Sequence, residues 1–324
     1  MNKEIGGYFE LENGINSEYY DFLRFNSSRN SLQFVIRERK IKKIYIPIYL
    51  CLVIEETLKN EKVEIEYYHI KENFLPEILN YDNSSYIYIV NYFGLISKRN
   101  IKKIAEKYNN KIILDNTHSF FMKPFLDIDI IYNCRKYFGV PDGSYLYTNL
   151  RINNEYKKAS SMERISHIFG RYEDNASNYY KFYIDAEESL NNRNIEIMSR
   201  ITQNMLKNIE YRKIEKIRKK NFKYLNNKLK TVNLLNIKSD SSNDFMYPLL
   251  VEKGNKVRKR LIKEKIYVPT LWPNLDNFTL NSFEKNLFEN LVVLPIDQRY
   301  TIDDMEYVYK KVYSIMKETM NEKN

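Results

Sequence analysis

The sequence predicts an α/β protein built on a mixed, mainly parallel sheet and followed by a smaller C-terminal α+β unit. Two observations predict this class: short apolar runs alternate with amphipathic stretches up to about residue 149, and helical periodicity dominates after it. Strands that alternate with helices are typical of a sheet covered on both faces. The 324 residues, 43% of them hydrophobic, suffice for a large core and a second, smaller one. We expect a large domain over residues 1–230 and a small domain over residues 231–324.

The strands of the first half are predicted from short apolar or alternating runs. They are expected at residues 44–48, 63–68, 86–90, 111–115, 129–132 and 144–148. Two helices are expected between them, over residues 51–59 and 100–109. In the second helix, four apolar side chains recur at helical spacing and share one face: Ile101, Ile104, Ala105 and Tyr108.

The second half is predicted mainly from helical periodicity. Residues 175–230 carry a helical signal with a break near Asn191, and an apolar stripe at helical spacing runs from Ile195 to Ile209. Alternating elements return after it and predict the small α+β unit. These elements are strands at residues 246–251 and 291–294, a helix at 255–265 and a closing helix from 302.

Composition and charge exclude several function classes. Two cysteines and three histidines supply neither a convincing zinc site nor a disulfide framework, so no metal is expected and both Cys51 and Cys134 are expected to pack. No apolar run approaches the ~20 residues that span a bilayer, and the first residues lack the apolar core of a signal peptide. We therefore expect a cytoplasmic protein with no membrane partner. The net charge of +10 is spread along the chain, and its densest stretch, residues 212–220, has the spacing of a solvated helix face rather than a nucleic-acid site.

Asp115 and Lys136 are the candidate catalytic residues. Asp115 ends one predicted strand, and Lys136 directly follows the next. Ligands of open α/β sheets bind beyond the carboxyl ends of the strands, so we expect both side chains in one crevice. Pyridoxal-phosphate (PLP) chemistry needs such a pair, because a lysine bonds to the cofactor aldehyde and a carboxylate keeps the pyridine nitrogen protonated. On spacing alone, a helix cap and a surface lysine are the simpler interpretation.

The residues around the pair change that balance. Residues 114–119 read Leu-Asp-Asn-Thr-His-Ser, and residues 133–136 read Asn-Cys-Arg-Lys. The first segment resembles the one that carries the cofactor aspartate in the DegT/StrS family of sugar aminotransferases, and the second resembles the one that carries the PLP-binding lysine. Further similar segments follow the family's order over most of the chain: residues 25–32, 46–49, 90–94, 139–144, 198–222 and 294–300.

The resemblance implies the PLP-dependent transferase fold type I, with a mixed, mainly parallel seven-stranded sheet and a smaller C-terminal α+β domain. It also implies a homodimer with active sites at the subunit interface. Within the site, it implies that Lys136 holds PLP, that Asp115 pairs with the ring nitrogen, and that His118 lies near the ring's phenolic oxygen. A buried structural histidine is the alternative for His118.

The phosphate-binding turn departs from the family pattern. Ser28 and Arg29 stand where the family has Gly-Thr before an N-terminal helix. The Ser28 hydroxyl can still donate and Arg29 adds charge, although an ordinary helix N-cap is the alternative for Ser28. Asn133 stands where a phosphate-binding serine is expected and can donate the same hydrogen bond. Asn194 is a candidate to reach the partner's cofactor phosphate, with a register that differs by about one residue.

The residues around the cofactor ring and the substrate are less defined. Cys51 replaces the aromatic residue that usually stacks on the ring, so Tyr49 and Tyr92 are candidates for this role, with packing as the alternative. The candidate substrate-binding residues are Trp272, which lies between prolines, and Arg299, which can bind a carboxylate or phosphate through two nitrogens. Packing for Trp272 and a structural ion pair for Arg299 are the alternatives.

The resemblance thus implies an aminotransferase that converts a keto group of a nucleotide-linked sugar to an amine, with glutamate as donor, for a surface polysaccharide or similar product. Three alternatives remain. A sugar dehydratase of this kind usually carries histidine instead of the lysine, which Lys136 argues against. A binding or partner subunit without catalysis would explain the altered phosphate turn and the missing stacking aromatic, but not the retained Asp115 and Lys136. A nucleic-acid-binding protein would explain the charge and the 29 tyrosines.

Overall fold

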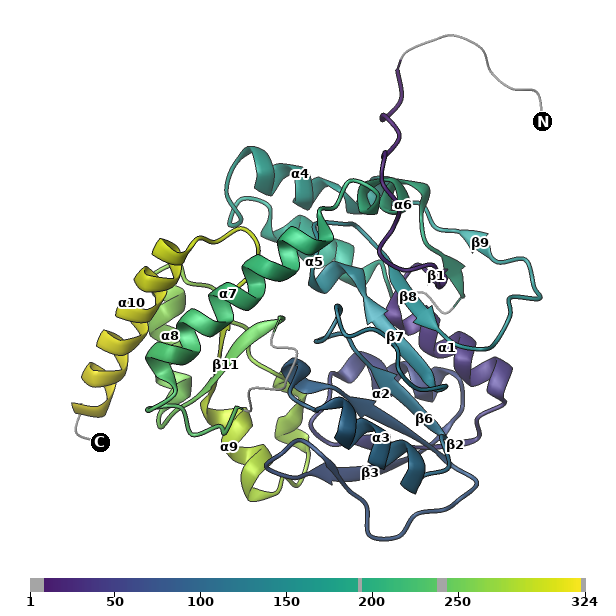
Figure 1. The fold of residues 1–324 in the computed structure, drawn as a ribbon, viewed down its shortest axis with the longest axis horizontal. Coiled ribbons are helices and arrows are strands. Elements are labelled where there is room, and N and C mark those ends of the chain that lie inside the picture. Colours follow the sequence, from purple (N-terminus) through teal and green to yellow (C-terminus); the bar gives the residue numbers. More distant parts are fainter. Residues whose placement is uncertain (1–8, 192–193, 238–243, 322–324) are drawn as a thin grey trace.

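The computed structural model describes residues 9–191, 194–237 and 244–321 (Figure 1). Within these ranges a ten-stranded sheet runs through the larger part of the molecule, in the order β4-β3-β2-β5-β6-β7-β8-β1-β10-β9. Its strands are β1 (Leu23–Phe25), β2 (Lys43–Pro47), β3 (Glu64–Ile70), β4 (Pro76–Glu77), β5 (Tyr86–Val90), β6 (Ile112–Asp115), β7 (Asp129–Asn133), β8 (Ser144–Tyr147), β9 (Lys157–Lys158) and β10 (Glu196–Ile197). A second sheet pairs β11 (Met246–Leu250) with β12 (Leu291–Pro295).

The strand directions make the large sheet mixed and mainly parallel. Strands β3, β2, β5, β6 and β7 pair in parallel, whereas β8 runs antiparallel to β7 and β1 antiparallel to β8. These seven strands are the longer ones, and β4, β9 and β10 add two residues each at the edges. The predicted fold class and its seven-stranded sheet are confirmed, with short additions on both sides.

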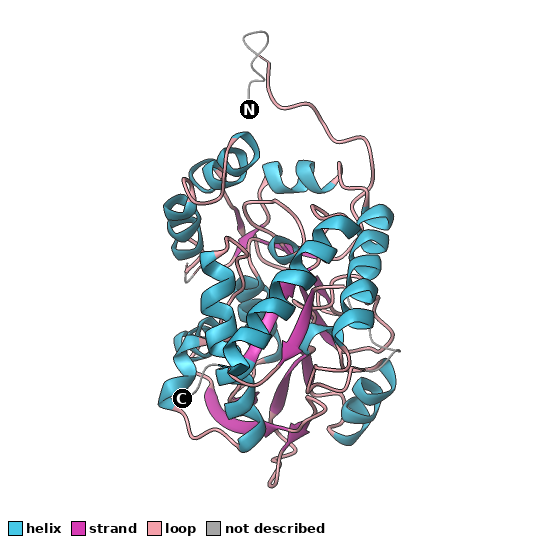
Figure 2. Ribbon diagram, turned by 90° about the vertical axis from the view of Figure 1, so that its left-hand side faces the viewer, coloured by secondary structure: helices cyan, strands magenta, loops and turns pink. Residues whose placement is uncertain are grey.

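Helices lie on both sides of these strands (Figure 2). Helix α1 (Ser28–Arg39) packs against β7 and β8, and α2 (Leu52–Asn60) packs against α1 and β3. Helix α3 (Lys98–Lys107) buries Ile101, Ile104 and Ala105 on one face, as its spacing predicts. Strands β5 and β6 are almost entirely buried, which explains why they read as continuous apolar runs.

The second sheet has its own apolar core. Strand β11 packs against α7 (Tyr211–Leu229), and β12 packs against α8 (Gly254–Lys263) and α9 (Ser282–Asn290). Helix α10 (Ile302–Asn321) packs against α7 and α8. Buried side chains of this core include Leu225, Leu249, Val292 and Val312. Helix α7 therefore contributes to the C-terminal core although it precedes residue 230.

The segment between the two sheets differs from its prediction. Helices α4 (Ser166–Glu173) and α5 (Tyr180–Glu188) come first, and the predicted stripe from Ile195 then begins in strand β10 rather than in a helix. Pairing of β10 with β1 holds this part extended, because it completes backbone hydrogen bonds at the sheet edge. Helix α6 (Arg200–Leu206) starts only at Ser199, whose hydroxyl accepts from the Thr202 N–H at 3.1 Å. Among the described residues, no helix has the length and apolar character needed to cross a membrane.

Candidate active site

Asp115 and Lys136 meet at the carboxyl edge of the large sheet. Asp115 is the last residue of β6, which lies between β5 and β7 and pairs with both in parallel. Lys136 ends the short 3-10 turn η2 (Cys134–Lys136) that directly follows β7. The two residues are close enough that the Lys136 charge acts on the Asp115 carboxylate. The sheet thus brings together the pair that the sequence predicts.

The Asp115 carboxylate is buried and held from two sides. One oxygen accepts the Thr117 N–H at 2.8 Å, and the other accepts the Tyr88 hydroxyl at 2.7 Å. Burial raises the pKa of Asp115 above its ordinary value, against the lowering effects of these hydrogen bonds and of the Lys136 charge. A carboxylate has about four acceptor positions, so each oxygen can accept one bond more.

The Lys136 side chain is exposed, and it has no hydrogen bond or ion pair with the described part of the chain. Its turn is fixed by Asn133, whose side-chain oxygen accepts the Arg135 N–H at 3.0 Å. Gly143 adds a second constraint, since its carbonyl accepts the Cys134 N–H at 3.1 Å and its N–H donates to the Asn26 carbonyl at 2.7 Å. Gly143 has a φ of +117°, which favours glycine over any side chain. The Lys136 side chain thus has no partner among the described residues, while hydrogen bonds hold the backbone of its turn.

Buried polar atoms without partners gather beside this turn, at the start of α1. The N-cap of α1 is Ser27, whose hydroxyl accepts the Asn30 N–H at 3.3 Å. Ser28 therefore is not the cap, and its hydroxyl is buried without a partner among the described residues, as are the Nε atoms of Arg29 and Arg135. A helix N-terminus carries partial positive charge and free N–H groups, which together favour an anion.

One carboxylate, Glu187 of α5, lies among these cations. It forms an ion pair with Arg135. Burial opposes ionisation of Glu187, yet the charges of Arg135, Lys136 and Arg29 lower its pKa below the ordinary value. Burial lowers the pKa of Arg29. Three cations thus act on this one carboxylate.

Aromatic rings form the opposite wall. The buried His118 ring stacks on Phe245, with ring centroids 4.1 Å apart and planes 11° apart, and more distantly on Trp272, at 6.3 Å and 13°. Burial lowers the pKa of His118 to about 3, so the imidazole is neutral. Tyr49 lies 5.1 Å and Tyr92 6.2 Å from the Trp272 ring, measured between centroids. Four predicted site residues thus lie in this cluster: Tyr49, Tyr92, His118 and Trp272.

The hydroxyl groups of both tyrosines are engaged in packing. Tyr49 donates to the Leu271 carbonyl at 2.7 Å, and Tyr92 donates to the Tyr49 carbonyl. Cys51 lies just before α2 and makes no side-chain cap. Both hydroxyl groups are thus occupied, and the stacking role of the two tyrosine rings stays a prediction.

Two predicted residues lie apart from the pair. The Asn194 side chain is exposed, and its carbonyl accepts Asn30 Nδ2 at 3.1 Å, which places this segment beside α1. Arg299 binds Asp297 through two nitrogens, at 2.7 and 2.8 Å, so its guanidinium is engaged in the ion pair that was the alternative interpretation.

Several residues at the site were not predicted. Thr117 and Arg135 lie within the two motifs, and their backbone positions beside Asp115 and Lys136 could have suggested them. The others reach the site from other strands and helices and carry no local signal: Tyr88, Glu187 and Phe245.

The strand order and the reversal of β8 among the seven longer strands define a class: the chain has the fold of the PLP-dependent transferases of fold type I. No protein-family model matches the chain, and no curated protein matches it. Solved structures of sugar aminotransferases match over most of their length. A DegT DnrJ EryC1 StrS aminotransferase from Brucella abortus is 14% identical, with a TM-score of 0.61, over 91% of this chain and 85% of that one.

Two further structures give the same result. Helicobacter pylori PseC, an aminotransferase involved in the biosynthesis of pseudoaminic acid, is 12% identical with a TM-score of 0.62, over 91% of this chain and 86% of that one. Spr1654 from Streptococcus pneumoniae, described as a sugar aminotransferase and determined in its PLP form, is 13% identical with a TM-score of 0.63, over 91% and 87%. At these identities the comparisons establish the fold.

Proposed function

We propose that this protein is a PLP-dependent aminotransferase that converts a keto group of a sugar to an amine. One observation carries the proposal: at one edge of a fold type I sheet, a buried carboxylate, Asp115, lies near the exposed Lys136, which has no hydrogen bond or ion pair among the described residues. Structural neighbours described as sugar aminotransferases support the reaction class and the kind of substrate.

The residues present fit PLP. Ser28, Arg29 and Arg135 offer buried donors that have no partner in the described part of the chain, beside a helix N-terminus, as a phosphate group needs. Asp115 can accept a pyridine N–H as a further bond, and the amine of Lys136 is exposed. When bound, the cofactor supplies an electron sink for the carbon that gains or loses the amino group. Asn133 is proposed as a further phosphate donor.

The chain's own residues then have separate tasks. Lys136 holds the cofactor and, once released, moves a proton at its amine nitrogen, which is general acid–base catalysis. Asp115 stabilises a positive charge on the ring nitrogen, and Tyr88 and Thr117 keep its carboxylate in place. The neutral His118, with its aromatic neighbours, keeps water from this side of the site.

We further propose a nucleotide-linked keto-sugar as acceptor and glutamate as amino donor, in the synthesis of a surface polysaccharide or similar product. The buried Nε atoms of Arg29 and Arg135, which have no partner among the described residues, suit the oxygens of phosphorylated ligands. Trp272 lies at the aromatic wall and remains the proposed substrate contact, whereas the ion pair with Asp297 leaves Arg299 the weaker candidate. We propose a cytoplasmic location. We also propose that residues 1–230 form the large domain and residues 231–324 the small one, with α7 contributing to the small domain's core.

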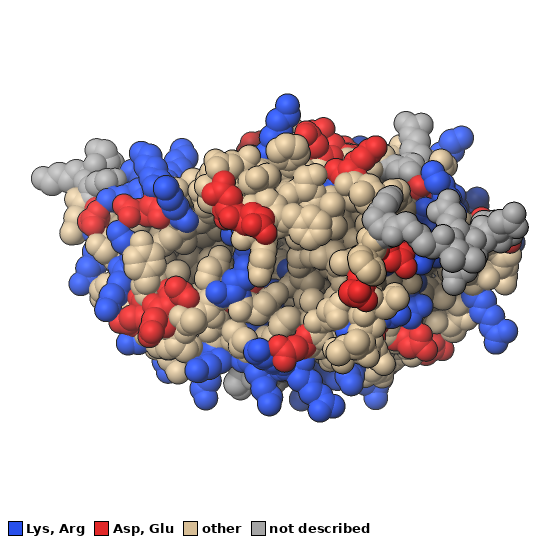
Figure 3. Space-filling view, turned by 90° about the horizontal axis from the view of Figure 1, so that it is seen from above, with Lys and Arg blue, Asp and Glu red and all other residues tan. Residues whose placement is uncertain are grey.

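We propose a homodimer as the working form. Aromatic side chains on α4 and α5 are exposed, with Tyr172 at 88%: Phe169, Tyr172, Tyr180, Phe182 and Tyr183. A broad uncharged area lies between charged groups on the face viewed from above (Figure 3), the side on which Figure 1 shows α4. Exposed apolar area of this kind favours burial against another subunit. Asn194 is proposed to approach the partner's cofactor phosphate.

A second candidate is a binding or partner subunit without catalysis. It is favoured by Cys51 at the position of the usual ring-stacking aromatic and by Phe245, which already stacks on the His118 ring. Phe245 thus covers one face of the ring that the resemblance assigns to the cofactor's phenolic oxygen.

The deciding experiment is an absorbance spectrum with added PLP, before and after borohydride, for the wild type, Lys136→Ala and Lys285→Ala. Lys285 is an exposed lysine on α9 and serves as a matched control. We expect a visible band that borohydride fixes on Lys136 in the wild type and in Lys285→Ala, and no band in Lys136→Ala. Absence of the band at saturating PLP would favour the binding or partner subunit without catalysis over the aminotransferase.

A further inference from the structure

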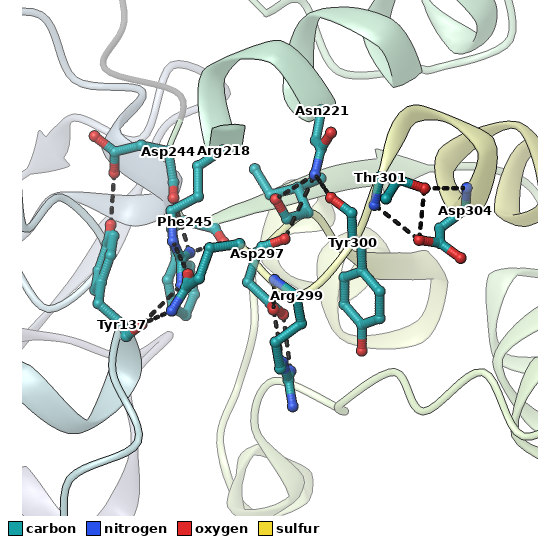
Figure 4. Close-up of polar contacts among 12 residues, drawn as sticks. Tyr137, Arg218, Asn221, Asp244, Phe245, Asp297, Arg299, Tyr300, Thr301 and Asp304 are labelled. Carbon is teal, nitrogen blue, oxygen red and sulfur yellow. Dashed lines mark hydrogen bonds and ion pairs between the residues drawn. The ribbon is translucent and has the colours of Figure 1, made fainter. Parts of the chain in front are cut away.

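A buried polar cluster connects the start of β11 to the turn that carries Lys136 (Figure 4). Its centre is Asp244, which is fully buried. One carboxylate oxygen accepts the Tyr137 hydroxyl at 2.6 Å, and the other is buried without a partner among the described residues. An unpartnered carboxylate oxygen in the interior costs free energy, so such a group is retained only where it has a task.

Arg218 of α7 completes the cluster without neutralising this carboxylate directly. It is 2% exposed, and its donors bind uncharged acceptors: the Gln298 side chain at 2.8 Å and the carbonyls of Asp244, Phe245 and Tyr137 at 3.0 to 3.1 Å. Its guanidinium also lies over the Tyr137 ring, 4.5 Å from the centroid. Gln298 donates to the same Tyr137 carbonyl at 2.8 Å. Tyr137 is thus held at its ring, its carbonyl and its hydroxyl.

The cluster touches the active site at two points. Tyr137 is the residue directly after Lys136, so its position sets where the lysine backbone lies. Phe245 is the residue directly after Asp244, and it stacks on His118 at 4.1 Å. A movement of the Asp244–Phe245 pair would therefore reach both Lys136 and the aromatic wall.

We propose that Asp244 is a positioning residue for Lys136: it binds the Tyr137 hydroxyl and so couples the first strand of the second sheet to turn η2. The proposal rests on the proposed function, because Lys136 is taken as the reacting amine. Asp244 itself touches neither substrate nor cofactor.

The coupling responds to pH. A hydrogen bond to an ionised carboxylate is stronger than one to a neutral carboxyl, so protonation of Asp244 loosens its hold on Tyr137. Burial raises the pKa of Asp244 to about 7, which puts this change near neutral pH. The charged and titratable groups that face Asp244 come from α7, from the Lys136 turn and from the N-terminal segment: Arg218, Lys219, Glu215, Tyr137, Tyr19 and Tyr20.

The test measures how fast Lys136 reacts with an amine-specific reagent, trinitrobenzenesulfonate, from pH 5.5 to 8.5, in the full-length protein without cofactor. Modification is read at Lys136 by mass spectrometry. The rate at each pH is divided by that of the exposed Lys285, because every amine reacts faster as it loses its proton. In the wild type we expect this ratio to show a step of about fivefold near pH 7, the effect of one net hydrogen bond. Asp244→Asn and Tyr137→Phe should both remove the step. Asp304→Asn, at an exposed carboxylate that binds Thr301 in the same part of the molecule (Figure 4), should keep it.

The outcomes separate the two proposals. A step that is unchanged in Tyr137→Phe overturns the positioning role, and this variant keeps the test decisive even if Asp244→Asn fails to fold. The PLP spectrum is recorded in parallel on the same variants. A visible band without any difference between the pH profiles supports the proposed function and rejects the positioning role. A difference between the pH profiles without a visible band supports the positioning role and rejects the proposed function.

Discussion

At the scale of single residues, the pair Asp115 and Lys136 illustrates what local sequence can predict. Each lies within a short run of characteristic neighbours, and each directly follows a strand whose apolar run is easily recognised. The more distant residues that act on them were not predictable in the same way. Tyr88 approaches Asp115 from β5, and Glu187 approaches Lys136 from α5, so only the assembled sheet and helices reveal them.

The first residue-scale prediction concerns Asp115→Asn. The amide keeps the acceptor for Thr117 or Tyr88 but can no longer stabilise a positive ring nitrogen. We expect PLP binding to persist while kcat falls by roughly 10²-fold or more, the usual effect of losing a preorganised charge in an active site. Transamination with glutamate and a keto-sugar nucleotide checks this. Asp304→Asn is the matched control, and a kcat within a factor of two of wild type in Asp115→Asn would contradict the assigned role.

The second residue-scale prediction concerns His118 and the pH dependence of stability. Burial lowers the pKa of His118 from its ordinary 6.5 to about 3, so as the pH falls the unfolded chain takes up this proton before the folded protein does. The stability that neutral His118 contributes is therefore lost progressively between pH 6.5 and about 3. In His118→Phe, which keeps an aromatic ring on Phe245, we expect a shallower loss of stability with falling pH than in the wild type. Chemical denaturation at pH 4 to 7 measures both slopes, and parallel slopes would contradict this prediction.

At the scale of elements, the starts of the helices carry much of the local information. The two serines at the start of α1 have different tasks: Ser27 caps the helix, and the Ser28 hydroxyl, beside Arg29, has no partner among the described residues. The sequence indicated this turn but not which serine does which, because both are good N-cap residues. The helix predicted from the apolar stripe at Ile195 was wrong at its start. Pairing of β10 with β1 keeps this part extended, and the cap at Ser199 lets the helix begin only after it.

The two serines allow a matched pair of variants. We expect Ser28→Ala to weaken PLP binding by about 10- to 100-fold, the effect of a lost hydrogen bond to a charged group, with little change in stability. Ser27→Ala should do the reverse, lowering the free energy of unfolding by ~1 kcal/mol through loss of the cap and leaving affinity near that of the wild type. PLP titration and urea denaturation of both variants check this. Equal effects of the two variants on affinity would contradict the division of tasks.

Helix α9, which packs on the second sheet, allows a test of how that sheet is attached to the large one. Its capping-box residue Glu284 is fully buried and also accepts from His69 Nδ1 at 2.7 Å and from the Ile70 N–H at 2.8 Å. The carboxylate thereby joins α9 to β3. We expect Glu284→Ala to lower the free energy of unfolding by about 3 kcal/mol, since these bonds are lost in the interior. Glu289→Ala, at an exposed position of the same helix, should change it by less than ~0.5 kcal/mol in urea denaturation.

At the scale of the whole molecule, the architecture was the most predictable feature. Alternating strands and helices predicted the class, and the order of motifs along the chain predicted fold type I, which the sheet order confirms. How the second core is built was less predictable. Helix α7 gives Phe222, Leu225 and Leu229 to that core, because a long amphipathic helix can serve two layers at once and its sequence does not tell which.

The proposed homodimer gives a prediction at this scale. Tyr172→Glu on α4 places a charge on the exposed aromatic surface, and we expect it to shift the protein from dimer to monomer. Tyr307→Glu on α10, where the side chain is 50% exposed, is the control and should leave the mass unchanged. Light scattering coupled to size-exclusion chromatography measures both. A wild-type protein that is monomeric at all concentrations would reject the homodimer.

The position of β1 has a consequence for synthesis on the ribosome. This strand lies between β8 and β10, although both follow it far downstream in the chain. When the parallel strands β2, β3, β5, β6 and β7 have left the ribosome, they can already pair with one another. Strand β7 has an open edge until β8 is synthesised, and β1 cannot pair until its neighbours β8 and β10 follow. The nascent chain therefore exposes an apolar strand edge for as long as this stretch is being translated. Slow translation between residues 133 and 197 should increase aggregation and dependence on chaperones, whereas slow translation after β12 should not.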